Sequence, residues 1–210
     1  MSPLLIEPHY LGSLEYYALL LQHEEVLFEV QDRFQKQTYR NRCLLLGANG
    51  IQVLTIPTKY SSQTIYKDVR IDHQQRWKKD HWGAFYSSYG KAPFFEYFAD
   101  PIHQVWERRH DFLLDLTTDL LKLTFKMLQK DVKMTFTEVV KKKDEHDLRD
   151  LIIPKKPFSD RKIYFPAPYT QLFGDAFVPN LSVVDLLLNQ GPQASAVLAA
   201  SFLKPSVSTK

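Results

Sequence analysis

The sequence predicts a single α/β domain with a mixed β-sheet and a helical half. Apolar residues make up 44% of the 210 positions and charged residues 24%, which is typical of a globular domain with a substantial core. β-rich segments recur in the first third of the chain, whereas apolar residues at helical spacing dominate residues 75–130. We therefore expect one domain over residues 1–210, completed by a loop and helix over about residues 151–200.

The first third of the chain predicts strands around one short helix. Residues 15–22 carry apolar side chains at helical spacing between two β-rich segments, which indicates a β-α-β opening. Gly47-Ala48-Asn49-Gly50 is a hairpin signal. Charged and apolar residues alternate over residues 67–72, which indicates a half-buried strand. The predicted strands of this part are residues 4–7, 26–30, 42–46, 51–57 and 67–72.

Helices dominate the middle of the chain. The clearest covers residues 111–130, where leucines form one stripe and acids precede bases, as the helix dipole favours. Pro101 suits the first turn of a helix through about residue 109, so a separate short helix or turn is expected at residues 94–99. Another helix is predicted over residues 75–89, and a strand over residues 133–140.

The last third combines a charge run, a long loop and a final helix. Residues 141–150 read KKKDEHDLRD and predict a solvated loop or helix start. Residues 154–180 are rich in proline and aromatics, and long irregular segments of this kind often serve a function. Ser182 and Asp185 have capping-box spacing and predict a helix that ends at Gly191.

Composition argues against some classes of protein. A net charge of +3 is too mild to indicate nucleic-acid binding, although it is compatible with an anionic small molecule. Cys43 is the only cysteine, so no internal disulfide can form and a reducing compartment fits. The N-terminus carries no signal-peptide pattern, and no run approaches the ~18 apolar residues of a membrane span. These features predict a cytoplasmic protein without a membrane span.

A cluster of cations suggests an anion site. Arg40 and Arg42 would lie on one face of a strand, with Asn41 on the other and Lys36 shortly before them. Guanidinium groups bind phosphate or carboxylate through paired hydrogen bonds, so these residues are predicted to bind a substrate. The alternatives are a solvated strand edge or, with neighbouring aromatics, base stacking.

Two histidines and one aspartate are candidates for acid–base chemistry. His81 lies on a predicted helix one turn after Trp77, and His9 follows the first strand. Asp32 follows the second strand and could orient a histidine or a hydroxyl group. Each could instead have a structural role, such as a histidine within an aromatic wall. The sequence contains no metal-ligand motif and indicates no particular cofactor.

Four stretches, in order, make the chain resemble the WbqC-like protein family. They are residues 7–11, residues 31–42 with 54–57, residues 67–69 with 77–95, and residues 169–191. The resemblance adds to the predicted substrate-binding residues, which become Lys36, Arg40, Asn41, Arg42, Tyr10, Trp77, Tyr89, Tyr169, Gln171 and Asn180. Asn180 also fits a purely structural capping role.

The resemblance implies a role in bacterial surface-polysaccharide or O-antigen assembly. It suggests a transferase that attaches an amino acid or acyl group to an activated sugar, with an anionic or activated-sugar substrate. The main alternative is a non-catalytic accessory protein that binds a glycan-assembly enzyme, and a nucleotide- or nucleic-acid-binding module is less favoured. A polar pocket joining His9, Asp32, Arg40 and His81 would favour the enzyme, whereas a flat apolar patch would favour the accessory protein. The oligomeric state stays open.

Overall fold

The structure is a computed structural model that describes residues 3–139 and 147–202. Its α-helices are α1 (Leu14–Leu20), α2 (Trp77–Tyr89), α3 (Phe95–Glu107), α4 (Leu113–Met127), α5 (Val183–Gln190) and α6 (Ala194–Ala200). Its strands are β1 (Leu4–Ile6), β2 (Glu25–Phe28), β3 (Arg42–Gly47), β4 (Gly50–Thr55), β5 (Thr58–Lys59), β6 (Arg70–Ile71) and β7 (Lys133–Phe136). The predicted α/β class is confirmed, with parallel and antiparallel strands in separate sheets.

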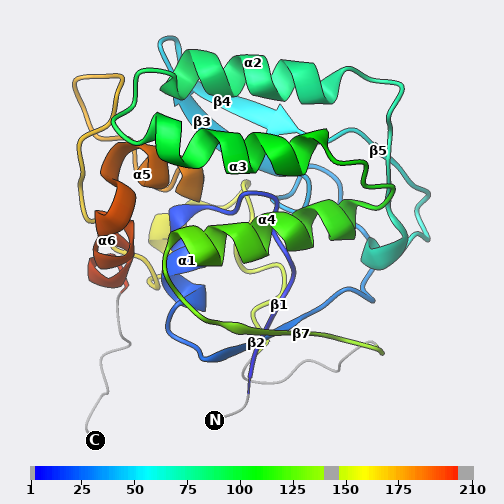
Figure 1. The fold of residues 1–210 in the computed structure, drawn as a ribbon. Helices are drawn as coiled ribbons and strands as arrows, with labels where there is room; N and C mark the ends of the chain where they lie inside the picture. Colours follow the sequence, from blue (N-terminus) through cyan, green and yellow to red (C-terminus); the bar gives the residue numbers. More distant parts are fainter. Residues whose placement is uncertain (1–2, 140–146, 203–210) are drawn as a thin grey trace, which may run out of the picture.

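A parallel sheet of β1, β2 and β7 lies at the base of the molecule (Figure 1). β2 is central, and α1 connects it to β1, as the predicted β-α-β opening requires. Ser13 caps α1 by accepting a hydrogen bond from the Tyr16 amide at 3.4 Å. On the other side of β1, Leu5 forms a parallel bridge with Asp147, and the Leu148 amide donates to the Leu5 carbonyl. The sheet thus joins the start of the chain to two segments far along it.

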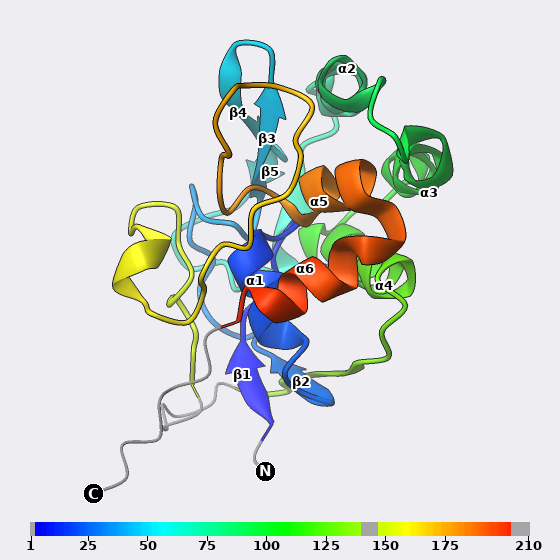
Figure 2. The same ribbon diagram turned by 90° about the vertical axis from the view of Figure 1, so that its left-hand side faces the viewer.

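Helices cover the sheet in a layered arrangement. Figure 1 shows α2, α3 and α4 one above another, with α4 nearest the sheet. The leucine stripe of α4 is buried, as its spacing predicts. The β3–β4 hairpin packs against α2, and Figure 2 shows α6 in front of α1 and α5 above α6. Both α5 and α6 contact α1. The last helices therefore cover the first.

Two predicted elements of the middle region have a different form. Residues 67–72 are not one strand, because a 3₁₀ helix (Tyr66–Asp68) precedes the two-residue β6, which pairs with β5. The Tyr66 and Lys67 amides donate to carbonyls of the loop after β2, and this turns the backbone. Pro101 lies inside α3 and does not begin a helix. The Tyr97 carbonyl loses the hydrogen bond that an N–H at position 101 would have donated, and the helix continues through the proline.

The expected capping box of α5 is also wrong. The Ser182 hydroxyl donates to the Leu11 carbonyl at 2.7 Å and makes no capping hydrogen bond. α5 does end before Gly191, but a 3₁₀ turn then leads into α6, which the sequence did not predict. The strand predicted over residues 133–140 ends at Phe136, and residue 140 lies outside the described residues.

Candidate functional site

Charged and polar side chains gather where the three parallel strands end. Glu7 follows β1, Glu29 and Asp32 follow β2, and Thr137 follows β7. The Thr137 hydroxyl donates to Glu29 Oε1 at 2.8 Å and accepts from the Val30 amide at 3.1 Å, which joins the ends of the two strands. The carboxyl edge of a parallel sheet is the usual location of ligand sites in α/β proteins.

A buried ion network begins at Glu7. Its Oε1 lies 3.3 Å from His9 Nε2 and 3.9 Å from Arg40 Nη2, and its Oε2 accepts from the Asp150 amide at 3.1 Å. Arg40 Nη2 donates to Asp150 Oδ1 at 2.9 Å. Glu7, His9 and Arg40 are each 1% exposed, whereas the Asp150 side chain is 34% exposed. Asp150 is therefore the outer member of this network.

The network fixes the charges of its members. Burial raises the pKa of Glu7, but the hydrogen bond to His9 and the Arg40 charge outweigh it and lower the pKa to about 2. Burial lowers the pKa of His9, which stacks on Tyr16 with ring centroids 4.0 Å apart. His9 Nδ1 and Arg40 Nη1 are buried and have no hydrogen-bond partner among the described residues. An orienting carboxylate with one imidazole nitrogen unused is a geometry suited to proton transfer.

A second network surrounds Arg149. Its guanidinium donates to Asp147 Oδ1 and Oδ2 at 2.9 and 2.6 Å, to Glu29 Oε2 at 3.2 Å and to Asp32 Oδ2 at 3.0 Å. Residues 141–146 of the predicted charge run lie outside the described residues. The sequence predicted a solvated segment, and for Asp147 and Arg149 this is wrong, because their side chains are only 2% and 4% exposed. Arg149, itself bound by Asp147, holds Asp32 in place.

Asp32 is the outer member of the second network. Its side chain is 29% exposed. Burial raises the pKa of Asp32, and the Glu29 charge adds to this, while Arg149 opposes it. A carboxylate with a raised pKa and access to solvent can exchange protons with a bound molecule.

A buried ion pair links α1 to the loop of residues 154–180. Arg161 donates to both carboxylate oxygens of Glu15, whose side chain is fully buried. Asn180 completes the pair, because its Oδ1 accepts from the Glu15 amide at 2.9 Å and its Nδ2 donates to Glu15 Oε2 at 3.3 Å. Asn180 therefore contacts protein groups, as its structural alternative requires.

Three predicted substrate-binding residues meet at Asp185 on α5. The Tyr169 hydroxyl donates to Asp185 Oδ2 at 2.5 Å, and Gln171 Nε2 donates to the same oxygen at 3.0 Å. The Tyr89 hydroxyl accepts from the Leu46 amide at 3.1 Å, and burial raises the pKa of Tyr89, to which the nearby Asp185 charge adds. Burial raises the pKa of Asp185. This cluster fixes the loop before α5. The Asp185 carboxylate therefore accepts hydrogen bonds from that loop and does not take the capping role that its spacing predicted.

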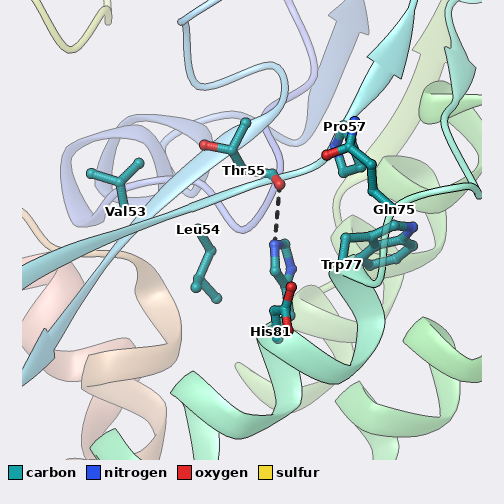
Figure 3. Close-up of a pocket in the computed structure, with 8 residues that line it drawn as sticks. Val53, Leu54, Thr55, Pro57, Gln75, Trp77 and His81 are labelled. Atoms are coloured by element: carbon teal, nitrogen blue, oxygen red, sulfur yellow. Dashed lines mark hydrogen bonds between the residues drawn. The ribbon is translucent and has the colours of Figure 1, made fainter.

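His81 and Trp77 line a pocket of about 280 Å³ beside β4 (Figure 3). His81 Nε2 lies 3.2 Å from the Thr55 carbonyl, and Nδ1 lies 2.9 Å from the Tyr10 hydroxyl. Burial lowers the pKa of His81 to about 4, against the opposing effect of the Thr55 carbonyl. The other lining residues are Val53, Leu54, Thr55, Pro57, Gln75 and Asp80. His9 and Asp32 are not among them, so the structure does not bring the two histidines to this one pocket.

The predicted cation pair does not form an anion site on a strand face. Arg40 precedes β3 and is buried against carboxylates, so it neither lies beside Arg42 on the strand nor faces water. Arg42 begins β3 opposite Thr55, and its Nε is buried without a partner among the described residues. Asn41 Nδ2 donates to the Ile56 carbonyl at 3.0 Å, and Lys36 is exposed.

Sequence reasoning missed several members of these networks. Glu7 and Glu29 carry a usable signal, since each is an acid directly after a β-rich run. Arg149, Asp150 and Arg161 lie in irregular segments and carry no local signal. Within residues 3–139 and 147–202, no group of three or more His, Cys, Asp or Glu side chains could hold a metal ion.

The fold and the site define an α/β protein whose charged groups gather at the carboxyl ends of a small parallel sheet. The family model of the WbqC-like protein family matches residues 7–157 and 154–197, and the chain belongs to this family. No curated protein and no solved structure matches the chain. In the part of the chain that the structure describes, no helix is long and apolar enough to cross a bilayer.

Proposed function

We propose that this protein is a transferase of bacterial glycan assembly that moves an acyl or aminoacyl group to an amine or hydroxyl of a sugar. The observation that carries the proposal is Asp32. It is a partly exposed carboxylate with a raised pKa at the end of the central strand, and Arg149 holds it in place. Membership of the WbqC-like family is compatible with a glycan-related role.

The charge arrangement favours an amine or hydroxyl over an anion at this position. Among the described residues, the outer groups of the two networks are the carboxylates of Asp32 and Asp150, whereas Arg40 and Arg149 are buried and already paired with acids. A molecule that reaches this edge meets hydrogen-bond acceptors. Ammonium and hydroxyl donors match them, whereas a phosphate would be repelled.

Asp32 would act as the general base of the transfer. The acceptor reacts as a hydroxyl, or as an amine whose ammonium form has first lost one proton to solvent. Its oxygen or nitrogen attacks the carbonyl carbon of an activated acyl donor and forms the new C–O or C–N bond. The bond from that carbon to the donor's leaving group breaks, and the acceptor's proton passes to Asp32. Arg149 keeps the carboxylate in one orientation, and this ordering favours the reaction. The raised pKa of Asp32 brings it closer to the working pH, as an efficient base requires.

Binding of the acceptor can be tested without knowledge of the donor. D-glucosamine carries an ammonium group that N-acetyl-D-glucosamine lacks, so ligand-observed NMR should detect binding of the first and not of the second. Asp32→Asn removes a charge-assisted hydrogen bond worth roughly 1.5–3 kcal/mol, so binding should weaken about tenfold or more. Asp131→Asn, at an exposed position, is the matched control and should bind normally.

Transfer is then tested by mass spectrometry of nucleotide-activated amino sugars incubated with acyl-CoA or aminoacyl donors. A product made by the wild type and by Asp131→Asn, but not by Asp32→Asn, would support the proposal. Asp32→Asn with undiminished binding and turnover would rule out the assigned role.

A further inference from the structure

The outer edge of β4 is not paired with any described residue. β3 and β4 form a two-stranded sheet, and Figure 2 shows β4 at the outer side of the hairpin. α2 lies against this sheet and contacts β4, where Gln52 Nε2 donates to the Ser88 hydroxyl. Ile51 and Val53 on β4 are 55% and 52% exposed. Edge strands that resist pairing usually carry charges or proline, yet β4 reads GIQVLT. The edge is therefore competent to accept another strand.

The hairpin register identifies the groups available for pairing. The Leu46 amide donates to the Tyr89 hydroxyl, and the Leu44 carbonyl accepts from the Ser182 amide. Both backbone groups therefore point away from β4. Leu46 lies opposite Ile51, and Leu44 lies opposite Val53. In an antiparallel ladder these are non-hydrogen-bonded pairs, so the N–H and C=O groups of Ile51 and Val53 point outward. At the end of β4, the Thr55 carbonyl also points outward, and it already accepts a hydrogen bond from His81.

We propose that this edge pairs with β4 of a second copy of the chain, antiparallel, about a two-fold axis at Gln52. Ile51 then lies opposite Val53 of the second copy, and Val53 lies opposite Ile51 of the second copy. This register uses the four outward groups of each edge in four hydrogen bonds and leaves the Thr55 carbonyl to His81. The two hairpins become one four-stranded antiparallel sheet.

Three features favour a second copy over an unrelated peptide. β4 is uncharged, so pairing with itself brings no like charges together. Ile51 and Val53 lie on one face, and the proposed register joins two such pairs into a single aliphatic cluster. The register also sets Asn49 of the second copy opposite Thr55, which lines the pocket in Figure 3, so the turn of one hairpin lies beside the pocket of the other copy. An isologous contact of this kind closes as a dimer.

The test is the molar mass of the purified full chain, measured by light scattering over a dilution series. The wild type should be a concentration-dependent dimer. Val53→Glu should be monomeric, because it places a carboxylate in the aliphatic cluster. The double variant Ile51→Lys/Val53→Glu should recover the dimer at low salt, since each lysine then faces a glutamate of the other copy. Tyr97→Lys, a similar change at an exposed site on α3, should leave the dimer intact.

Circular dichroism melts establish that each variant is folded. A wild type that stays monomeric at every concentration would overturn the proposal, as would a dimer that persists in folded Val53→Glu. A double variant that stays monomeric would overturn the register. The inference does not depend on the proposed transfer chemistry, because amino-sugar binding and molar mass are measured separately.

Discussion

Replacing His81 should remove a pH dependence from the stability of the fold. The Thr55 carbonyl can only accept, so His81 Nε2 must donate to it, and in the neutral ring Nδ1 then accepts from the Tyr10 hydroxyl. A second proton on the ring would meet the Tyr10 donor in a buried setting. The folded state therefore holds His81 neutral, and its pKa falls from 6.5 to about 4.

The sign and size of the effect follow from this pKa. Between pH 6.5 and about pH 4 the unfolded chain binds a proton at His81 and the folded chain does not, so stability falls as the pH falls. Above this window the histidine is neutral in both states and makes no pH-dependent contribution. A fall from 6.5 to about 4 corresponds to about 3 kcal/mol, at about 1.4 kcal/mol for each pKa unit.

The assay is urea unfolding followed by tryptophan fluorescence, on wild type and His81→Gln, at both ends of the window. His81→Gln should lower stability at neutral pH but lose about 3 kcal/mol less on acidification. His103→Gln, a change at a partly exposed histidine of α3, is the control and should keep the wild-type pH dependence. If His81→Gln keeps the full wild-type pH dependence, the buried neutral histidine is not its source.

Three further changes test the ion networks and the packing. Arg161→Ala should lower the free energy of urea unfolding by about 3–5 kcal/mol, because Glu15 stays buried without its cation, and Glu15→Gln in the same chain should recover part of it; a loss below about 0.5 kcal/mol would contradict this. As the pH falls from 4.5 to about 2, wild type should lose about 3 kcal/mol more than Glu7→Gln, because Glu7 keeps its charge down to about pH 2 only in the fold; equal losses in acid unfolding would refute this. In thermal melts Gly83→Ala should gain about 0.5–1 kcal/mol, since an added Cβ meets nothing within 4 Å, whereas Gly191→Ala should lose more than about 2 kcal/mol, since its Cβ would lie 2.4 Å from an aromatic ring at a φ of +53°; similar melting temperatures would argue against the described packing.

Local patterns predicted the elements whose stability is local. The leucine stripe of α4 and the glycine-flanked turn of the β3–β4 hairpin both report burial and turn geometry within one segment. The strand expected at residues 67–72 failed because hydrogen bonds to the loop after β2 decide its backbone, and no alternation of side chains encodes them. Pro101 predicted a helix start because proline suits a first turn, but a proline can also lie inside a helix at the cost of one backbone hydrogen bond, as in α3.

The candidate site was predictable only in part. Position after a strand identified His9 and Asp32, which do lie at the carboxyl edge of the sheet, although their predicted catalytic roles stay predictions. Arg40 was assigned to an external anion because its nearest charged neighbours in sequence are cations. Its actual partner, Asp150, is 110 residues away. Ion pairs of this range depend on the whole topology, which single-sequence patterns do not contain.

The burial of Glu15 has a consequence for the order in which the chain folds. Its cation, Arg161, is 146 residues further along, and Asn180 follows later still. The β-α-β unit at the start therefore cannot reach its final packing while it is the only part synthesised, because α1 would bury an acid without a counter-ion. Synthesis at roughly 5–20 residues per second leaves this unit waiting for many seconds. Folding is in this respect a late event, completed when the region around Asn180 closes over α1, and its rate should reflect these distant contacts more than the propensity of any helix.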